Sequence, residues 1–223
     1  MSRIGITLAA LLAITALHLH AQAPTQAGFS RTPLFDNATV NVFRLMLQAG
    51  ARETPHTHPN SMLVVWISRG EVEMLNGQRQ PPRTRNVGEV EFFAREVTHA
   101  ASNAGSAPFE LVVIDIKPDR IPGGIAPPAP PPAGVSRTPV LDNPEVTATR
   151  LEFSASAREP IHTHPYDLVV IPLTASKLEV QIGGDKQTRD YAPGNSLFIA
   201  RNQPHAVANV GPGPFLVMGV AIK

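Results

Sequence analysis

The sequence predicts an all-β protein built from two tandem barrels of equal size. Three observations support this prediction. The chain repeats itself, its apolar residues form short runs separated by turns, and its 23 prolines and 16 glycines in 223 residues favour turns over helices. Beyond residue 27, we find no segment with the long 3.6-residue periodicity of a helix.

The first 27 residues have the layout of a secretory signal peptide. Arg3 precedes an uncharged apolar run at 4–17, and a short polar stretch with small residues follows. Cleavage after Ala23 or after Ala27 fits this layout. The apolar run is shorter than the roughly 20 residues that a membrane-spanning helix requires. We therefore expect a periplasmic or secreted protein without a stable membrane anchor after cleavage.

The composition excludes several kinds of chemistry. The 19 basic and 18 acidic side chains nearly cancel, so charge gives no reason to expect a nucleic-acid partner. There is no cysteine, which excludes disulfides, thiolate ligands and a cysteine nucleophile. Any metal must therefore be bound by nitrogen and oxygen atoms.

A repeat without gaps organises the rest of the chain. A shift of 106 residues places 30–117, the first repeat, on 136–223, the second repeat, and both begin with Ser-Arg-Thr-Pro. The residues between them, 118–135, are rich in Pro, Gly and Ala and predict a semi-rigid linker. Within the repeats, the apolar run 63–67 and the alternating segment 177–182 predict short strands. Many short strands separated by turns are typical of a sandwich or a barrel.

The histidines after residue 27 all obey the repeat. Each repeat contains His-Thr-His and a third histidine further on: His56, His58 and His99 in the first, and His162, His164 and His205 in the second. Side chains two residues apart leave a strand on the same face, so the first two imidazoles project together. A barrel can bring the third imidazole to them. Three imidazoles form a site for a divalent transition metal and leave positions open for water or substrate.

These residues resemble the motifs of the cupin superfamily. The cupin pattern is Gly, five residues, His-x-His, three or four residues, Glu, six residues and Gly, followed later by Gly, five residues, Pro-x-Gly, two residues, His, three residues and Asn. The matching residues are Gly50, His56, His58, Gly70, Gly88, His99 and Asn103 in the first repeat, and His162, His164, Gly194, His205 and Asn209 in the second. The resemblance covers both repeats. It implies a bicupin of two double-stranded β-helix (jelly-roll) barrels, with the six histidines as metal ligands.

Both repeats lack the cupin glutamate. Met62 and Leu63 stand at its place in the first repeat, and Leu168 and Val169 in the second. The Pro-x-Gly turn is also lost. Among cupins, the sequence from His162 to Thr174 looks most like small bacterial single-cupin proteins associated with β-alanine degradation. Three-histidine cupins also include thiol dioxygenases and gentisate-type ring-cleaving dioxygenases.

The resemblance implies two classes of function. One is non-haem metal-dependent oxygen chemistry on a small organic substrate, with Fe(II) as the expected metal and Mn, Cu, Ni or Zn as alternatives. The other is a metal-loaded or empty module that binds a small molecule without turnover. Oxalate decarboxylation is disfavoured, because that chemistry is expected with the glutamate that is absent. A monomer and a homo-oligomer are both compatible with the sequence.

Three acidic residues near the histidines are further candidates. Asp167 follows the second His-Thr-His by three residues, where the first repeat has Ser61, so it is a candidate metal ligand in the second repeat alone. A turn-capping role is the alternative. Glu53 and Glu159 precede the first histidine of each motif by three residues, so we expect them to project away from it and to pair with arginines. The arginines considered as partners are Arg52, Arg95, Arg158 and Arg201.

Overall fold

A computed structural model of the chain describes residues 27–124 and 130–223, and it confirms the all-β prediction. Within these ranges every regular element is a strand. The predicted signal peptide, except for its last residue, lies outside the described residues, as does 125–129 of the predicted linker. In the part of the chain that is described, no helix of a length and apolarity suited to crossing a membrane occurs.

The strands of the two repeats follow the same order along the chain. The first repeat has β1 (Phe29–Asp36), β2 (Val40–Leu47), β3 (Ser61–Trp66), β4 (Gly70–Asn76), β5 (Gln78–Arg79), β6 (Arg83–Arg85), β7 (Val90–Phe93), β8 (His99–Asn103) and β9 (Phe109–Ile116). The second has β10 (Val135–Asp142), β11 (Val146–Phe153), β12 (Arg158–His162), β13 (Asp167–Pro172), β14 (Ser176–Ile182), β15 (Asp185–Tyr191), β16 (Leu197–Ile199), β17 (His205–Asn209) and β18 (Phe215–Ile222). Most strands of the second repeat lie 106 residues after their counterparts, which agrees with the sequence repeat.

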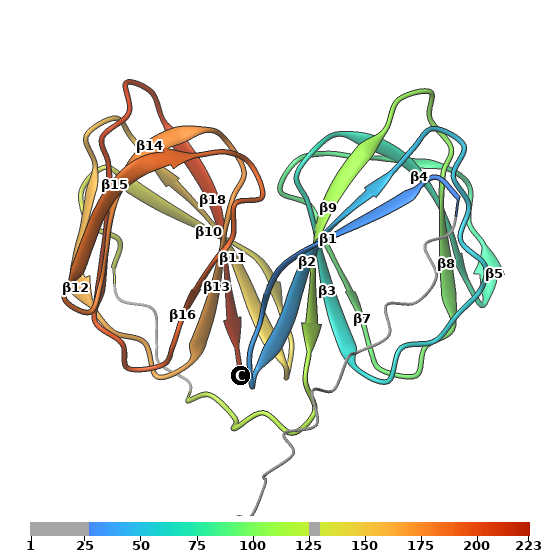
Figure 1. The fold of residues 1–223 in the computed structure, drawn as a ribbon, viewed down its shortest axis with the longest axis horizontal. Coiled ribbons are helices and arrows are strands. Elements are labelled where there is room, and N and C mark those ends of the chain that lie inside the picture. Colours follow the sequence, from blue (N-terminus) through green and yellow to red (C-terminus); the bar gives the residue numbers. More distant parts are fainter. Residues whose placement is uncertain (1–26, 125–129) are drawn as a thin grey trace, which may run out of the picture.

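Each repeat folds into a barrel of two antiparallel sheets, and the two barrels lie side by side (Figure 1). In the first, one sheet has the order β1-β2-β9-β3-β7, and the other has β5-β4-β6 with β8 beside β4. In the second, the sheets are β10-β11-β18-β13-β16 and β12-β17-β14-β15. The prediction of two tandem jelly-roll barrels is confirmed. The five-stranded sheets face each other, whereas His99, His162 and His205 lie at the ends of strands of the four-stranded sheets.

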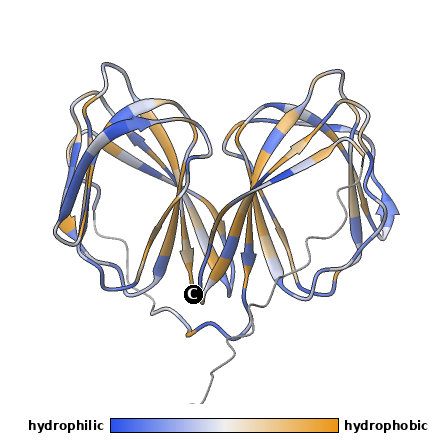
Figure 2. Ribbon diagram, viewed as in Figure 1, coloured by the Kyte–Doolittle hydropathy of each residue, from blue (hydrophilic) through white to orange (hydrophobic). Residues whose placement is uncertain are grey.

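The central strands of the five-stranded sheets are apolar on both faces. Along β3, Leu63 and Val65 are buried in a core shared by the two barrels, whereas Val64 and Trp66 lie in the core of the first barrel alone. From the second repeat the shared core contains Val146, Ala148, Val169, Ile171, Leu173, Met218, Val220 and Ile222. Figure 2 shows these central strands as the most apolar part of the molecule. Burial on both faces explains the uninterrupted apolar run in β3.

Two hydrogen bonds at equivalent positions join the barrels. Thr39 Oγ1 donates to Asp167 Oδ2 at 2.7 Å, and Ser61 Oγ donates to Glu145 Oε1 at 2.8 Å. Thr39 and Glu145 are equivalent in the repeat, and so are Ser61 and Asp167. Both hydroxyl donors belong to the first repeat, and both carboxylate acceptors belong to the second.

Two buried asparagines end the strands that begin with the third histidine of each repeat. In β17, Asn209 Nδ2 donates to Gly213 O at 2.8 Å, and its Oδ1 accepts from Gly211 N at 3.1 Å. In β8, Asn103 makes the corresponding bonds to Ala107 O and from Gly105 N, both at 2.9 Å. These side chains satisfy backbone groups of the following turn, so the last position of the cupin pattern has a structural role here.

Candidate metal centre

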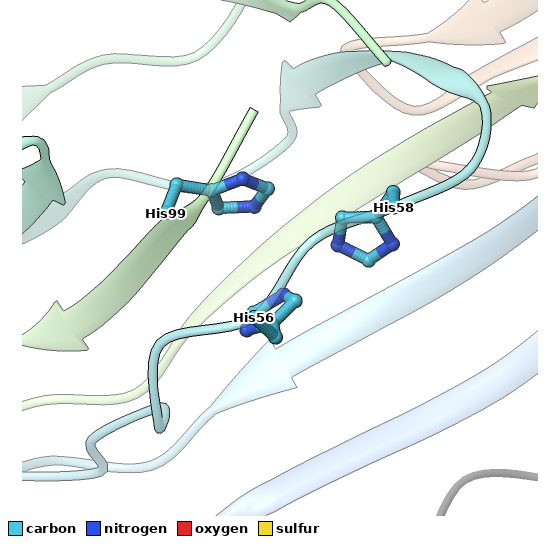
Figure 3. A group of neighbouring side chains, drawn as sticks. All are labelled: His56, His58 and His99. Atoms are coloured by element: carbon cyan, nitrogen blue, oxygen red, sulfur yellow. The ribbon is translucent and has the colours of Figure 1, made fainter. Parts of the chain in front are cut away.

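The structure brings the six histidines together in two groups of three. In the first repeat, His56 forms an isolated bridge with His99, the first residue of β8, and His58 lies beside them (Figure 3). In the second, His162 ends β12 opposite His205, which begins β17, and His164 completes the group. Within each group one nitrogen of every ring lies within 4.8 Å of the others. Each group can therefore offer three nitrogen ligands to one ion.

Backbone carbonyl groups orient most of the imidazole rings. His56 Nδ1 lies 2.8 Å from Thr54 O, and His162 Nδ1 lies 2.8 Å from Pro160 O. The Nδ1 atoms of His99 and His205 have similar contacts with Val97 O and Gln203 O. A carbonyl oxygen only accepts hydrogen bonds, so these contacts place the proton on Nδ1. The lone pair of Nε2 is then available to a metal, and His162 Nε2 lies 3.0 Å from His164 Nε2.

Burial favours the neutral form of His58, His99, His164 and His205 by lowering the pKa of each ring. It lowers the pKa of His58 to about 4, and the nearby His56, His99 and Arg31 add to the effect. In the second repeat, burial and then His162, His205 and Arg137 lower the pKa of His164 to about 4. Burial also lowers the pKa of His99 and of His205. Metal binding at neutral pH therefore requires no proton to leave these four rings.

The two groups differ in their neighbours. Tyr166 Oη lies 3.1 Å from His164 Nδ1, and the first repeat has Asn60 at the equivalent position. In the first repeat, the Phe93 ring stacks on His99 with the ring centroids 4.5 Å apart, where the second repeat has Ile199. The sequence analysis missed Tyr166. The sequence did contain a signal for it. Both repeats have His-Thr-His-Pro, and the next residue is Asn60 in the first repeat but Tyr166 in the second.

The structure contradicts the hypothesis that Asp167 is a metal ligand. Asp167 begins β13 and faces the first barrel, on the same side of the strand as Val169 and Ile171. Its carboxylate accepts hydrogen bonds from Thr39 and from the backbone and side chain of Arg201. The alternation of side chains along the strand thus directs this carboxylate to the interface and away from the second histidine group.

The expected orientation of Glu159 is also wrong. An irregularity in the pairing of β12 lies between Glu159 and His162, and both side chains turn to the same side. The partner of Glu159 is Arg137, at 2.7 Å, which was not among the arginines considered. Glu53 accepts a hydrogen bond from the backbone N–H of Ala101 at 2.7 Å, and burial raises its pKa.

Comparison with known proteins supports the fold. No family model matches the chain. A germin-like protein of subfamily 2, member 2, from Arabidopsis thaliana is 29% identical over 93 residues, which are 40% of this chain and 42% of that protein. The chain thus spans about two fifths of the length of this curated relative.

Solved structures resemble the whole described fold. A cupin 2 conserved barrel domain protein from Leptotrichia buccalis matches 91% of this chain and 92% of its own at 15% identity (TM-score 0.60). The oxalate decarboxylase of Lactobacillus farciminis matches 87% and 81% at 13% identity (TM-score 0.65). Salicylate 1,2-dioxygenase from Pseudoaminobacter salicylatoxidans matches 89% and 75% at 10% identity (TM-score 0.68). The chain therefore has a cupin fold, and the germin-like relative together with these structures supports the cupin superfamily.

Proposed function

We propose that this protein is an exported bicupin that binds a divalent transition metal in each repeat. The observation that carries the proposal is the pair of equivalent imidazole groups, each with its nitrogen atoms within 4.8 Å of one another. The donor set fits such an ion, because neutral imidazoles suit Fe, Mn, Cu, Ni and Zn, and no thiolate competes. Fe(II) is the first candidate. The export part of the proposal rests on the N-terminal sequence pattern.

We further propose that the metal serves the oxidation of a small organic substrate by dioxygen. A bound Fe(II) ion supplies open positions for substrate and dioxygen. The chain's own contribution is to orient the imidazoles through their Nδ1 contacts and to shield them, since His99 and His205 are only 6% and 2% exposed. Salicylate 1,2-dioxygenase shows that this fold can support such chemistry.

Metal content tests the first part of the proposal. The wild type is expected to bind two metal ions per chain, and His56→Ala/His58→Ala and His162→Ala/His164→Ala are each expected to bind one, because a single imidazole does not retain the ion. Mass spectrometric metal analysis of protein reconstituted with Fe²⁺ without oxygen gives the stoichiometry. As a matched control, Thr57→Ala/Thr163→Ala changes the exposed residues between the histidines and should keep both ions. A wild type without bound metal after reconstitution contradicts the proposal.

Oxygen uptake separates turnover from simple binding. The Fe²⁺-loaded protein is expected to consume dioxygen with at least one member of a panel of thiols, diketones and hydroxy-aromatic acids. Uptake should fall when the histidine pair of the active repeat is removed. A protein that binds metal but consumes no oxygen with any of them would instead be a binding module.

A further inference from the structure

Tyr166 lies against one ring of the second histidine group. Its hydroxyl oxygen Oη is 3.1 Å from His164 Nδ1, and its ring stacks on the His164 ring with the centroids 5.0 Å apart and the planes 13° from parallel. The other ring nitrogen, His164 Nε2, lies 3.0 Å from His162 Nε2. The His164 ring therefore presents Nε2 to the histidine group and Nδ1 to the phenol.

Tyr166 can serve as the hydrogen-bond acceptor of His164 in its metal-binding tautomer. A neutral imidazole carries one proton, so a ring that binds a metal through Nε2 carries this proton on Nδ1. The Nδ1–H group of His164 then donates to Tyr166 Oη, just as the Nδ1–H groups of His162 and His205 donate to backbone carbonyl oxygens. The phenol thus gives this ring the kind of partner that the backbone gives the other two.

The first repeat has no equivalent of this contact. Asn60 stands at the position of Tyr166, and its side chain hydrogen-bonds the carboxylate of Asp115 instead of a ring nitrogen. Among the residues that the structure describes, none forms a hydrogen bond with the ring of His58, the counterpart of His164. A side-chain partner for the second histidine of the His-Thr-His sequence is therefore a feature of the second repeat.

The linker between the repeats packs against the segment that carries Tyr166. Gly124 N donates to Pro165 O at 2.8 Å. Gly123 approaches so closely that a Cβ atom at this position would lie 2.8 Å from Tyr166 Cβ. The backbone on both sides of the Pro165–Tyr166 bond is thus in contact with the linker, which fixes the position from which the phenol reaches the imidazole.

We propose that Tyr166 is a positioning residue of the second metal site: its hydroxyl accepts the hydrogen bond of His164 Nδ1–H and so holds Nε2 toward the bound ion. This inference rests on the proposed metal-binding function. It makes the two sites unequal, because the affinity of the second depends on a hydroxyl that the first repeat lacks. Loss of such an outer-shell partner lowers metal affinity by roughly 10–100-fold, and a neutral phenol should lie at the low end of this range.

Titration of the full chain with Co²⁺, followed by its visible absorption, tests the inference. The His56→Ala/His58→Ala chain is the parent, because it isolates the second site. Tyr166→Phe keeps the aromatic ring and removes only the hydroxyl, so the affinity should fall by roughly 10-fold. Tyr191→Phe is the matched control. It removes the same atom from the same repeat, but that hydroxyl accepts a hydrogen bond from Arg189 Nε at 2.9 Å, so the affinity should not change.

Proton NMR at saturating Co²⁺ separates positioning of one ring from a general effect on the barrel. The Nδ1–H protons of imidazoles bound to Co²⁺ give strongly shifted signals that disappear in D₂O as the protons exchange. In Tyr166→Phe, one of the three signals, that of His164, should exchange faster than in the parent. The signals of His162 and His205 should keep their rates, because their acceptors are backbone carbonyl groups. An equal change in all three signals would overturn the inference.

The possible outcomes separate the inference from the function on which it rests. If the parent chain binds no Co²⁺, the proposed metal site is wrong and the inference falls with it. If the parent binds Co²⁺ and Tyr166→Phe alters neither the affinity nor the exchange of any signal, only the inference is overturned. A loss of affinity in Tyr191→Phe as large as that in Tyr166→Phe would also overturn it, because the loss would then not depend on contact with His164.

Discussion

Replacement of Asp167 by alanine is expected to lower the free energy of unfolding by about 3 kcal/mol. The Asp167 side chain is 7% exposed, and it accepts hydrogen bonds from Arg201 Nη2 at 2.9 Å, Arg201 N at 2.8 Å and Thr39 Oγ1 at 2.7 Å. Its removal takes this acceptor from Thr39 Oγ1 and Arg201 N at the interface of the barrels, whereas Arg201 Nη2 keeps its hydrogen bond to Ile121 O at 2.6 Å. The expected loss is at the low end for a broken buried ion pair, because Arg201 is 26% exposed and keeps some hydration.

The pH dependence of this loss identifies its origin. Burial raises the pKa of Asp167, but the bonds from Arg201 and Thr39 outweigh burial and place the pKa below its ordinary value. A lowered pKa means that the stabilisation is fully present above the unfolded pKa of about 3.9 and is lost as the pH falls through the folded pKa. Urea unfolding should thus show the full difference between wild type and Asp167→Ala at pH 7 and a smaller one in acid.

The equivalent position in the first repeat provides the control. Ser61→Ala removes the bond that the hydroxyl donates to Glu145 and the longer one, 3.2 Å, that it accepts from Arg95 N. Because the serine carries no charge, the loss should be only about 1 kcal/mol, with little dependence on pH near neutrality. A loss for Asp167→Ala no larger than that for Ser61→Ala would contradict the assigned role of the Asp167 ion pair.

The repeat made the fold and the histidine groups predictable. The strand at β3 could be predicted because burial on both faces makes its residues uniformly apolar. The two imidazoles of each His-Thr-His could be placed on one side because residues two apart in a strand project to the same face. The third histidine could be assigned because the same spacing occurs twice. Both predictions depend on the local spacing of residues and on the comparison of one repeat with the other, and the sequence alone provides this information.

The acidic residues could not be placed in the same way, because their positions depend on strand register and on tertiary partners. Glu159 faces the histidines only because β12 contains an extra residue, and no local pattern marks that bulge unambiguously. Asp167 faces the other barrel because it shares the face of β13 with Val169 and Ile171, which lie in the core between the barrels. A spacing of three residues from a histidine in the sequence therefore did not predict whether an acidic side chain lies near the histidine group.

The shared core makes a further prediction, because it places residues of one repeat against the other. Ile171→Ala is expected to lower the free energy of unfolding by about 3–4 kcal/mol, since Ile171 is 0% exposed and its truncation leaves a cavity between the barrels. Ile161, in the same repeat, is 61% exposed, so Ile161→Ala removes the same atoms at little cost and serves as the control.

The aromatic residues allow each barrel to be followed separately. The single tryptophan, Trp66, lies in the core of the first barrel, and the two tyrosines, Tyr166 and Tyr191, belong to the second repeat. If the shared core couples the barrels, Ile171→Ala should shift the urea midpoint of Trp66 fluorescence as far as that of the tyrosine near-ultraviolet circular dichroism. A shift of the tyrosine signal with an unchanged Trp66 midpoint would show instead that the barrels unfold independently, and that the apolar contact between them contributes little to the stability of the first barrel.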